Sequence, residues 1–453
     1  MSLPQEPDFA AFIGVDWADR EHAWSLQVAG STERETGILQ HTPEAIEAWA
    51  MQWATRFGGR PVAVAVEQSR GALIYALSKF PHLVLYPIHP STSYDYRKAM
   101  FPSGCKNDPQ DADLLLDFLT LHRNRQRALQ PDTEQIRQLR ILVEQRRQLV
   151  DDRTAHTNRA TGQLKLYFPQ VLDWFDELAA PICRDFLERW PTLPHVQAED
   201  PEQLRSFFYQ HGSRSPERIE SRLRQIREAQ PLTQDAAIIV PGVTMVRTML
   251  AVAAALQEGI RKLEKSIEQV TSTHPDYPLF ASFPGAGPAM APRLLAAFGS
   301  LRERFASVEE VLSFSGIAPV MEASGKQRWT HFRWACPKFL RQTFHEFAGL
   351  SIQQCSWARE FYDSHRRKGK SHHAAVRALA FKWIRILFSC WKSHQPFDEN
   401  LYLAARAARA CPLPAPTSVP PSSSCPPLPS CGKRKDSRLK SAGQILKSLM
   451  AEA

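Results

Sequence analysis

The sequence predicts an α/β region at the N-terminus, followed by two long helices and a mostly α-helical C-terminal region. Short apolar runs alternate with helical patterns in the first part of the chain. Two much longer stretches of helical periodicity then flank a less regular middle segment. At about 150 residues per domain, 453 residues have room for about three domains.

The N-terminal alternation is typical of a mixed sheet covered by helices. Five apolar runs are candidate strands: Phe9–Asp16, Trp24–Ala29, Gly37–Gln40, Pro61–Glu67 and Leu83–Ile88. The first three can form an antiparallel meander. Thr42 and Pro43 have the N-cap and N1 chemistry of a helix before the fourth strand, and a second helix is expected at 71–80.

Two long helices are predicted in the middle of the chain. Residues 132–168 have the spacing of one helix, which Pro169 ends, and Met245–Val270 has the spacing of a second. Such helices can pair as an antiparallel arm around the segment between them, or dimerise with another subunit. Periodicity does not distinguish between these arrangements.

The C-terminal part contains one recognisable turn. Leu279–Phe298 reads as helix, tight Pro-Gly-Ala-Gly turn, helix. This pattern resembles a helix-hairpin-helix that meets a DNA phosphate, although a plain turn between two helices looks the same. The remainder to about Arg409 is predicted to be helical. Residues 411–430 contain eight prolines, which predicts a disordered linker before a basic tail.

Charge is distributed unevenly along the chain. The whole chain carries a formal net charge of +9, yet residues 322–392 alone hold fourteen Lys/Arg and four Asp/Glu. The first 120 residues hold nine basic and fifteen acidic residues. An acidic front and a basic back suggest a metal-binding or catalytic part joined to a part that binds a polyanion. A solvated basic face without a partner is the alternative.

Composition excludes several classes of protein. No run of 18 apolar residues occurs, so no membrane span is expected. The first 15 residues lack the basic start of a secretory signal. Eight scattered cysteines without a Cys-x-x-Cys pair argue against a disulfide scaffold and a zinc ribbon. We expect a cytoplasmic protein.

Four carboxylates are spaced as a metal site requires. Asp16 ends the first predicted strand and Glu67 ends the fourth, so both can emerge at one edge of the sheet. Asp108 and Asp111 are expected at the N-cap and N3 of a helix, on one face. Mg²⁺ or Mn²⁺ prefers such oxygen ligands and supports phosphoryl chemistry. Singly, each residue has a plainer interpretation in helix capping or at a loop edge.

A serine in a small-residue turn is the candidate nucleophile. Ser324 precedes Lys326, Arg328, His331 and Arg333. These cations can bind a scissile phosphate and stabilise its pentacovalent charge. His331 is a candidate base only by its proximity in sequence, and a structural turn serine is the alternative.

Basic residues of the C-terminal part are candidate nucleic-acid contacts: Lys326, Arg328, Arg333, Lys338, Arg341, Arg366, Arg367, Lys368 and Lys370. Aromatic residues from Trp329 to Phe344 lie between several of them. Such aromatics can stack on bases, or they can form a helical core with a basic rim.

The motifs together resemble those of the DEDD transposases of insertion sequences, which are related to the Piv invertase. The carrying motifs are Ile13-Gly14-Val15-Asp16, Val64-Ala65-Val66-Glu67, Lys106-Asn107-Asp108-Pro109-Gln110-Asp111-Ala112, Pro284-Gly285-x-Gly287, Phe314-Ser315-Gly316-Ile317-Ala318-Pro319 and Ala323-Ser324-Gly325-Lys326, with the later Leu340-Arg341. The resemblance covers about residues 1–395. Members often have Glu-Ser-Gly where this chain has Ala-Ser-Gly.

The resemblance implies a fold, a set of catalytic residues and an RNA partner. It implies a ribonuclease-H-like (RuvC-like) domain with metal ligands Asp16, Glu67, Asp108 and Asp111, and a transposase domain with catalytic Ser324. It also implies a structured bridge RNA that pairs with donor and target DNA. The expected parts are 1–125, the RuvC-like domain; 126–275, the coiled-coil region with its insertion; 276–400, the transposase domain; and 411–453, the linker and tail.

The sequence therefore predicts a transposase of an insertion sequence that cuts and rejoins DNA as a homo-oligomer, a dimer or a tetramer. The expected location is the bacterial cytoplasm, in association with the nucleoid, without a membrane partner. A metal-dependent Holliday-junction resolvase or nuclease is the rival enzyme. A non-catalytic nucleic-acid-binding protein is the alternative from another class.

Overall fold

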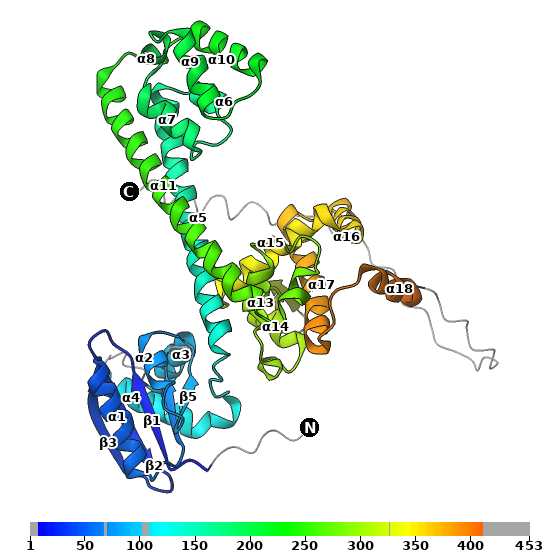
Figure 1. The fold of residues 1–453 in the computed structure, drawn as a ribbon. Coiled ribbons are helices and arrows are strands. Elements are labelled where there is room, and N and C mark those ends of the chain that lie inside the picture. Colours follow the sequence, from blue (N-terminus) through cyan, green and yellow to red (C-terminus); the bar gives the residue numbers. More distant parts are fainter. Residues whose placement is uncertain (1–7, 68–69, 102–107, 326, 411–453) are drawn as a thin grey trace, which may run out of the picture. The chain divides into compact units, whose positions relative to one another are not determined.

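A five-stranded mixed sheet forms the N-terminal part of the structure (Figure 1). The computed structural model describes residues 8–67, 70–101, 108–325 and 327–410. The strands are β1 Ala11–Asp16, β2 Glu21–Val28, β3 Arg34–Gln40, β4 Val62–Val66 and β5 Leu83–Pro87. Their order is β3-β2-β1-β4-β5; β1, β2 and β3 form the predicted antiparallel meander, and β4 and β5 run parallel to β1. The predicted mixed α/β sheet is confirmed.

Helices cover both faces of this sheet. They are α1 Pro43–Arg56, α2 Ala72–Leu77, α3 Pro90–Met100 and α4 Asp108–His122, followed by the 3₁₀ turn η1 Arg123–Arg125. Helix α1 begins as predicted, because the Thr42 hydroxyl accepts a hydrogen bond from the Ala45 amide at 3.2 Å. Helices α1 and α2 share one apolar core with Ile13 and Val64, whereas α4 packs on Ala63 and Ala65 of the opposite face.

Glycine at position 14 lets α4 lie directly on β1. A Cβ atom at Gly14 would stand 2.1 Å from the carbonyl oxygen of Ala112 and 2.5 Å from the amide nitrogen of Leu116. Both of these are backbone atoms of α4, so no side-chain rotation can make room for a methyl group. This close approach holds the first turns of α4 against the end of β1.

The two long helices pair with each other within the chain. They are α5 Glu134–Tyr167 and α11 Ala236–Ser272. The Gln135 side chain donates to the Val270 carbonyl at 2.7 Å, and Arg146 pairs with Glu264 at 2.6 Å, so the helices run antiparallel. The structure thus selects the intramolecular arm that periodicity left open.

The second long helix starts nine residues earlier than predicted. Pro241 lies inside the observed helix, beyond its first turn, so it removes the one hydrogen bond that an amide there would donate to the Ala237 carbonyl. Its neighbour Gly242 packs on the Tyr167 ring, which a Cβ would approach to 2.9 Å. The end of α5 and the first part of α11 can therefore pack this closely only with a residue as small as glycine at position 242.

A helical insertion joins the far ends of the long helices. Its helices are α6 Val171–Trp174, α7 Pro181–Arg189, α8 Leu193–Gln197, α9 Pro201–Gln210 and α10 Pro216–Glu228. They share a core with the ends of α5 and α11, in which Phe186 and Phe208 are fully buried.

Helix α11 qualifies the expectation about membrane spans. It is long and apolar enough to cross a membrane by length and composition, and 22% of its most apolar 18-residue window is buried. Arg247 interrupts the apolar sequence of this helix, so a search for 18 consecutive apolar residues did not identify the segment. In this structure, the helix packs on α5 and on the insertion core.

The C-terminal part contains a β-hairpin that the sequence analysis did not predict. Its helices are α12 Tyr277–Ala281, α13 Ala291–Phe298, η2 Arg302–Arg304, α14 Val308–Phe314, α15 Lys338–Gln354, α16 Ser356–Arg367 and α17 His372–Ser393. The hairpin consists of β6 Val320–Ser324 and β7 Gln327–His331. The prediction of helix throughout this region was therefore wrong at 320–331. Every described hairpin residue except Val320 is exposed, so no alternation of buried and polar residues marks the strands.

The predicted helix–turn–helix at Leu279–Phe298 corresponds to α12 and α13. Gly285 has φ +81°, and a Cβ there would come within 3.2 Å of the α15 backbone. All residues of α13 are buried. This turn therefore has a packing role, as in the plainer interpretation.

The described residues from Asp398 onward form a unit separate from the rest of the chain. Its described part is α18 Glu399–Ala410. The predicted linker and tail at 411–453 lie outside the described residues.

We expect Gly14→Ala to destabilise the protein by at least about 1–3 kcal/mol, because the added methyl group must push α4 away from β1. Thermal unfolding of the full chain measures this as a first transition several degrees lower. The matched control is Gly162→Ala in α5, where no atom lies within 4 Å and the change should be neutral or stabilising. A Gly14→Ala protein as stable as the wild type would contradict the close contact.

Candidate catalytic centres

Two of the predicted carboxylates emerge side by side from the sheet. Val15 of β1 is paired with Val66 of β4 in parallel register, so the residues that follow them, Asp16 and Glu67, emerge at the same edge of the sheet. Side chains alternate along a strand, so Asp16 lies on the same face as Gly14, the face that α4 covers. Asp16 is only 9% exposed, and Glu67 is half-buried.

Helix α4 brings a third carboxylate to this edge. Asp111 lies in the first turn of α4, next to Ala112, whose carbonyl meets Gly14. It is 4% exposed, and an oxygen of its carboxylate lies 2.6 Å from a guanidinium nitrogen of Arg97 in α3. Asp108 is the first residue of the same helix, whereas the sequence analysis expected it to be the N-cap. Its side chain lies outside the described part.

Other contacts fix α4 on the sheet. Asp113 accepts a hydrogen bond from the buried Ser25 of β2, and Arg34 of β3 pairs with Asp117. These bonds tie α4 to the antiparallel half of the sheet, whereas Gly14 sets its distance from β1. The position of Asp111 therefore depends on contacts with three strands.

A buried histidine anchors the turn that follows Asp16. The Ala18 amide donates to Nδ1 of His22 at 3.1 Å, and Nε2 of His22 lies 2.8 Å from Nδ1 of His41. Burial, helped by His41, lowers the pKa of His22 to about 4. His22 is thus neutral at physiological pH, with Nδ1 as an acceptor that holds the turn beside the metal-site candidate.

The chemistry of this edge fits a hard divalent cation. Asp16, Glu67 and Asp111 offer carboxylate oxygens, the donors that Mg²⁺ and Mn²⁺ prefer. Two of the three are buried, where uncompensated negative charge is unfavourable. Among the described side chains, which exclude that of Asp108, no three His, Cys, Asp or Glu residues stand close enough to enclose an ion.

The candidate nucleophile lies on a different sheet, the C-terminal hairpin. Ser324 ends β6 and is paired with Gln327 across a tight turn, in which Gly325 has φ +56°. Ser324 is exposed. His331 is paired with Val320, four residues from Ser324 along β6 and so about 13 Å away. Proximity in sequence was therefore misleading for His331 as a base within this hairpin.

Sequence reasoning missed a polar network on the face of the hairpin that carries Ser324. Glu322 accepts a hydrogen bond from the Trp329 indole at 2.6 Å, and its other oxygen lies 2.6 Å from Nε2 of His331. The pairing lowers the pKa of Glu322 and raises the pKa of His331. Glu322 is two residues before Ser324 and shares its face. Only the hairpin register reveals this arrangement.

The predicted nucleic-acid contacts divide into exposed and packed cations. The exposed ones are Arg328, Lys338, Arg366, Arg367, Lys368 and Lys370. Arg333 and Arg341 are half-buried, and Arg341 stacks over Phe332, 4.5 Å from its ring centre. Arg377, which the sequence analysis did not select, stacks on the same ring at 4.7 Å. Lys326 lies outside the described residues.

The aromatic residues among these cations have two different roles. Phe344 is buried in the helical core, whereas Trp334 is 76% exposed and Trp329 is 45% exposed. Phe344 therefore fits the helical-core interpretation, and base stacking by Trp329 and Trp334 stays a prediction.

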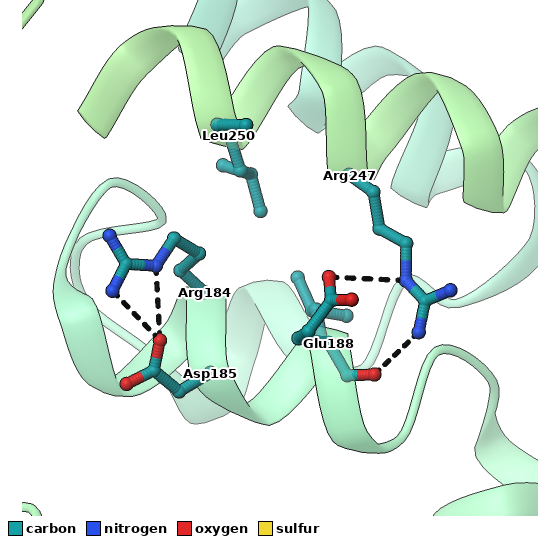
Figure 2. A pocket seen from close by; sticks show the side chains of 7 residues that line it. Arg184, Asp185, Glu188, Arg247 and Leu250 are labelled. Carbon is teal, nitrogen blue, oxygen red and sulfur yellow. Dashed lines mark hydrogen bonds and ion pairs between the residues drawn. The ribbon is translucent and has the colours of Figure 1, made fainter. Parts of the chain in front are cut away.

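A pocket elsewhere has no unpaired charge to offer a ligand. It has a volume of about 210 Å³ and lies between α7 and α11 (Figure 2). Arg184 pairs with Asp185, and Arg247 pairs with Glu188, as the dashed lines show. We do not assign it a ligand.

Comparison with known proteins identifies transposase profiles that match two separate parts of the chain. A DEDD profile of the IS110 type, described as transposase, matches residues 13–169. A second profile, described as the transposase IS116/IS110/IS902 family, matches residues 277–363. The first match contains all four carboxylates, and the second contains Ser324.

Whole-length relatives support the same grouping. The candidate mini-circle transposase for IS117 of Streptomyces coelicolor is 27% identical over 87% of this chain and 97% of that protein. A 43.6 kDa protein of insertion element IS110 from the same organism is 24% identical over the same shares. A 42 kDa protein of IS900 from Mycobacterium paratuberculosis is 27% identical over 70% of this chain and 79% of its own length.

The two family profiles cover both the sheet edge and the hairpin. The relatives from the IS117 and IS110 elements align with 87% of the chain. The chain is a DNA transposase and belongs to the IS110/IS116 family of DEDD insertion-sequence transposases.

Proposed function

We propose that this transposase cuts and rejoins DNA with two centres, a carboxylate metal site and the nucleophile Ser324. The observation that carries the proposal is the register of β1 and β4, which makes Asp16 and Glu67 neighbours on the face where α4 brings Asp111. Asp108 completes the proposed set. The strand order β3-β2-β1-β4-β5 supports a ribonuclease-H-like, RuvC-like assignment for residues 1–125.

The proposed metal ligands are Asp16, Glu67, Asp108 and Asp111. When bound there, Mg²⁺ or Mn²⁺ supplies charge that orients a scissile phosphate and stabilises its developing negative charge. Asp16 and Asp111 contribute buried carboxylate oxygens at one sheet edge, where a cation is favoured over uncompensated negative charge.

The proposed covalent step uses Ser324. Its Oγ attacks a backbone phosphorus atom, a new Oγ–P bond forms, and one P–O bond to a deoxyribose breaks. The serine proton passes to a base or solvent, and the leaving oxygen gains a proton to become a sugar hydroxyl. In strand exchange, a hydroxyl of the other DNA segment attacks the phosphoserine and releases Ser324. In this second step a sugar O–P bond forms, the Oγ–P bond breaks, the attacking hydroxyl gives up its proton to a base or solvent, and the Ser324 oxygen regains one.

Features of the hairpin support this role for Ser324. The residue is exposed beside a tight turn, where a DNA backbone can reach it, and Arg328 and Lys338 are exposed in the same region. These cations suit a scissile phosphate. We assign residues 276–400 to this transposase domain and residues 126–275 to the arm with its insertion.

We further propose that a structured bridge RNA selects donor and target DNA. Phosphate contacts from exposed lysine and arginine side chains position a duplex without reading its bases, so sequence choice requires another reader. Base pairing with a guide RNA provides it. The proposed location is the bacterial cytoplasm, with the protein on the nucleoid.

The arm supports assembly into a homo-oligomer, a dimer or a tetramer. Large apolar side chains near the start of α11 are exposed: Ile238 is 39%, Val240 is 63% and Met245 is 45% exposed. An apolar surface of this kind is typical of an interface, and a second copy of the chain would cover it.

We expect Ser324→Ala to abolish strand exchange and the covalent protein–DNA adduct without loss of DNA binding, because only the attacking oxygen is removed. Mass spectrometry of protein trapped on nicked DNA detects the adduct. The matched control is Thr330→Ala, which removes a hydroxyl from the opposite face of the same hairpin and should leave both activities intact. Wild-type nicking by Ser324→Ala would instead favour the metal-dependent resolvase.

We expect nucleic-acid affinity to fall steeply with salt. If about six phosphates are neutralised, log K changes with log salt at a slope near −5. Protein without RNA should bind DNA with little sequence preference, and adding the element's own non-coding RNA should create preference and activity together. Site-selective recombination by RNase-treated protein would contradict RNA guidance.

A further inference from the structure

The buried ion pair between Arg97 and Asp111 lies inside the proposed metal site. A guanidinium nitrogen of Arg97 is 2.6 Å from the carboxylate oxygen of Asp111. The Asp111 side chain is 5% exposed and the Arg97 side chain 22% exposed. Arg97 lies in the last turn of α3, and Asp111 lies in the first turn of α4. No sequence motif pointed to Arg97.

The pair satisfies a charge requirement that exists before any ion binds. Asp16 and Asp111 are both buried at this edge, and a buried carboxylate requires a cation or strong donors nearby. Arg97 supplies a positive charge at Asp111. A divalent cation coordinated by Asp111 would supply the same compensation, with twice the charge.

The two kinds of cation compete for one carboxylate. A guanidinium that stays at 2.6 Å from Asp111 stands within a few ångströms of any ion that Asp111 coordinates, and like charges at that distance repel strongly in a buried site. Arg97 has a route out of the pair, because its side chain is partly exposed and long.

We propose that Arg97 holds Asp111 until a divalent cation binds and then moves to the scissile phosphate. Arg97 is thus a positioning residue before loading and a phosphate ligand afterwards. This inference rests on the proposed metal site. A planar guanidinium suits both roles, since it forms paired hydrogen bonds with a carboxylate or with a phosphate.

The proposal makes ion binding and DNA binding mutually supportive. DNA offers Arg97 a phosphate, which weakens its hold on Asp111 and favours the ion. The bound ion, in turn, frees Arg97 for DNA. By linkage, each must strengthen the binding of the other.

The test titrates Mn²⁺ into the metal-free full chain and measures free Mn²⁺ by electron paramagnetic resonance. We expect Arg97→Gln to bind Mn²⁺ roughly tenfold or more tightly than the wild type, because a competing cation is removed. Arg97→Lys retains the positive charge and should stay closer to the wild type. The matched control is Arg56→Gln, which breaks an arginine–carboxylate pair with Glu35 between α1 and β3, away from α4, and should leave Mn²⁺ affinity unchanged.

The outcomes separate this inference from the proposed function. Unchanged or weaker Mn²⁺ binding by Arg97→Gln, with normal binding by the wild type, would overturn the role of Arg97 alone. If neither the wild type nor Arg97→Gln binds Mn²⁺, the metal site and this inference are overturned together. If Arg97→Gln does not fold without metal, Mn²⁺ should restore its thermal transition. If saturating Mn²⁺ does not restore the thermal transition of Arg97→Gln, the proposed role of Arg97 is overturned.

A second measurement tests the phosphate contact. With the ion present, Arg97→Gln should bind DNA several-fold more weakly than the wild type, and the salt slope should decrease by about one. Arg56→Gln should match the wild type in both respects. Equal DNA affinity and salt slope for Arg97→Gln and the wild type would overturn the transfer to phosphate.

Discussion

The contact between β1 and α4 at Gly14 is the constraint on which the candidate metal site depends. Backbone atoms of α4 approach the strand so closely that no side chain fits between them. Two residues further along β1, Asp16 emerges, and one residue before the contact on α4 stands Asp111. Asp16 and Asp111 therefore belong to β1 and α4, and these two elements can lie this close only because Gly14 has no side chain. A looser contact would separate them.

A second set of contacts ties α5 to the C-terminal helices. Glu346 of α15 accepts hydrogen bonds from Arg293 of α13 at 2.5 Å and from Arg147 of α5 at 3.0 Å. Asp132, just before α5, accepts from the Ser300 amide at 3.3 Å. Burial lowers the pKa of the neighbouring Arg304 to about 10, and this residue donates to the Ala297 carbonyl at 3.1 Å. The long helix thus enters the C-terminal core through paired charges.

Local signals in the sequence predicted the elements that carry the carboxylates. The strand that ends in Asp16, the strand directly before Glu67 and the Thr42 cap of α1 appear where the chemistry of single residues indicated. The register of Val15 with Val66 adds what no local signal contains, because it joins residues fifty positions apart.

The remaining features depend on contacts distant in sequence or on strands without a buried face. The β6–β7 hairpin lacks an alternating pattern, since almost all its residues are exposed, and its Glu322 network becomes visible only when its strands are paired. The predicted start of α11 at Met245 was late, because the helix also includes the segment with Pro241, a residue that is unfavourable inside a helix. Arg97 is an ordinary helix-end arginine until α3 and α4 are packed together.

The most direct test of this account is to locate the metal ion on the protein. Fe²⁺ substituted for Mg²⁺, with ascorbate and peroxide, generates radicals that cut the backbone near the ion, and mass spectrometry maps the cuts. The account predicts cuts in three segments together: the end of β1 at Asp16, the end of β4 at Glu67, and the start of α4 around Asp108–Ala112. Excess Mg²⁺ should suppress all three. Cuts at one segment alone, or at places away from this edge, would contradict a shared carboxylate site.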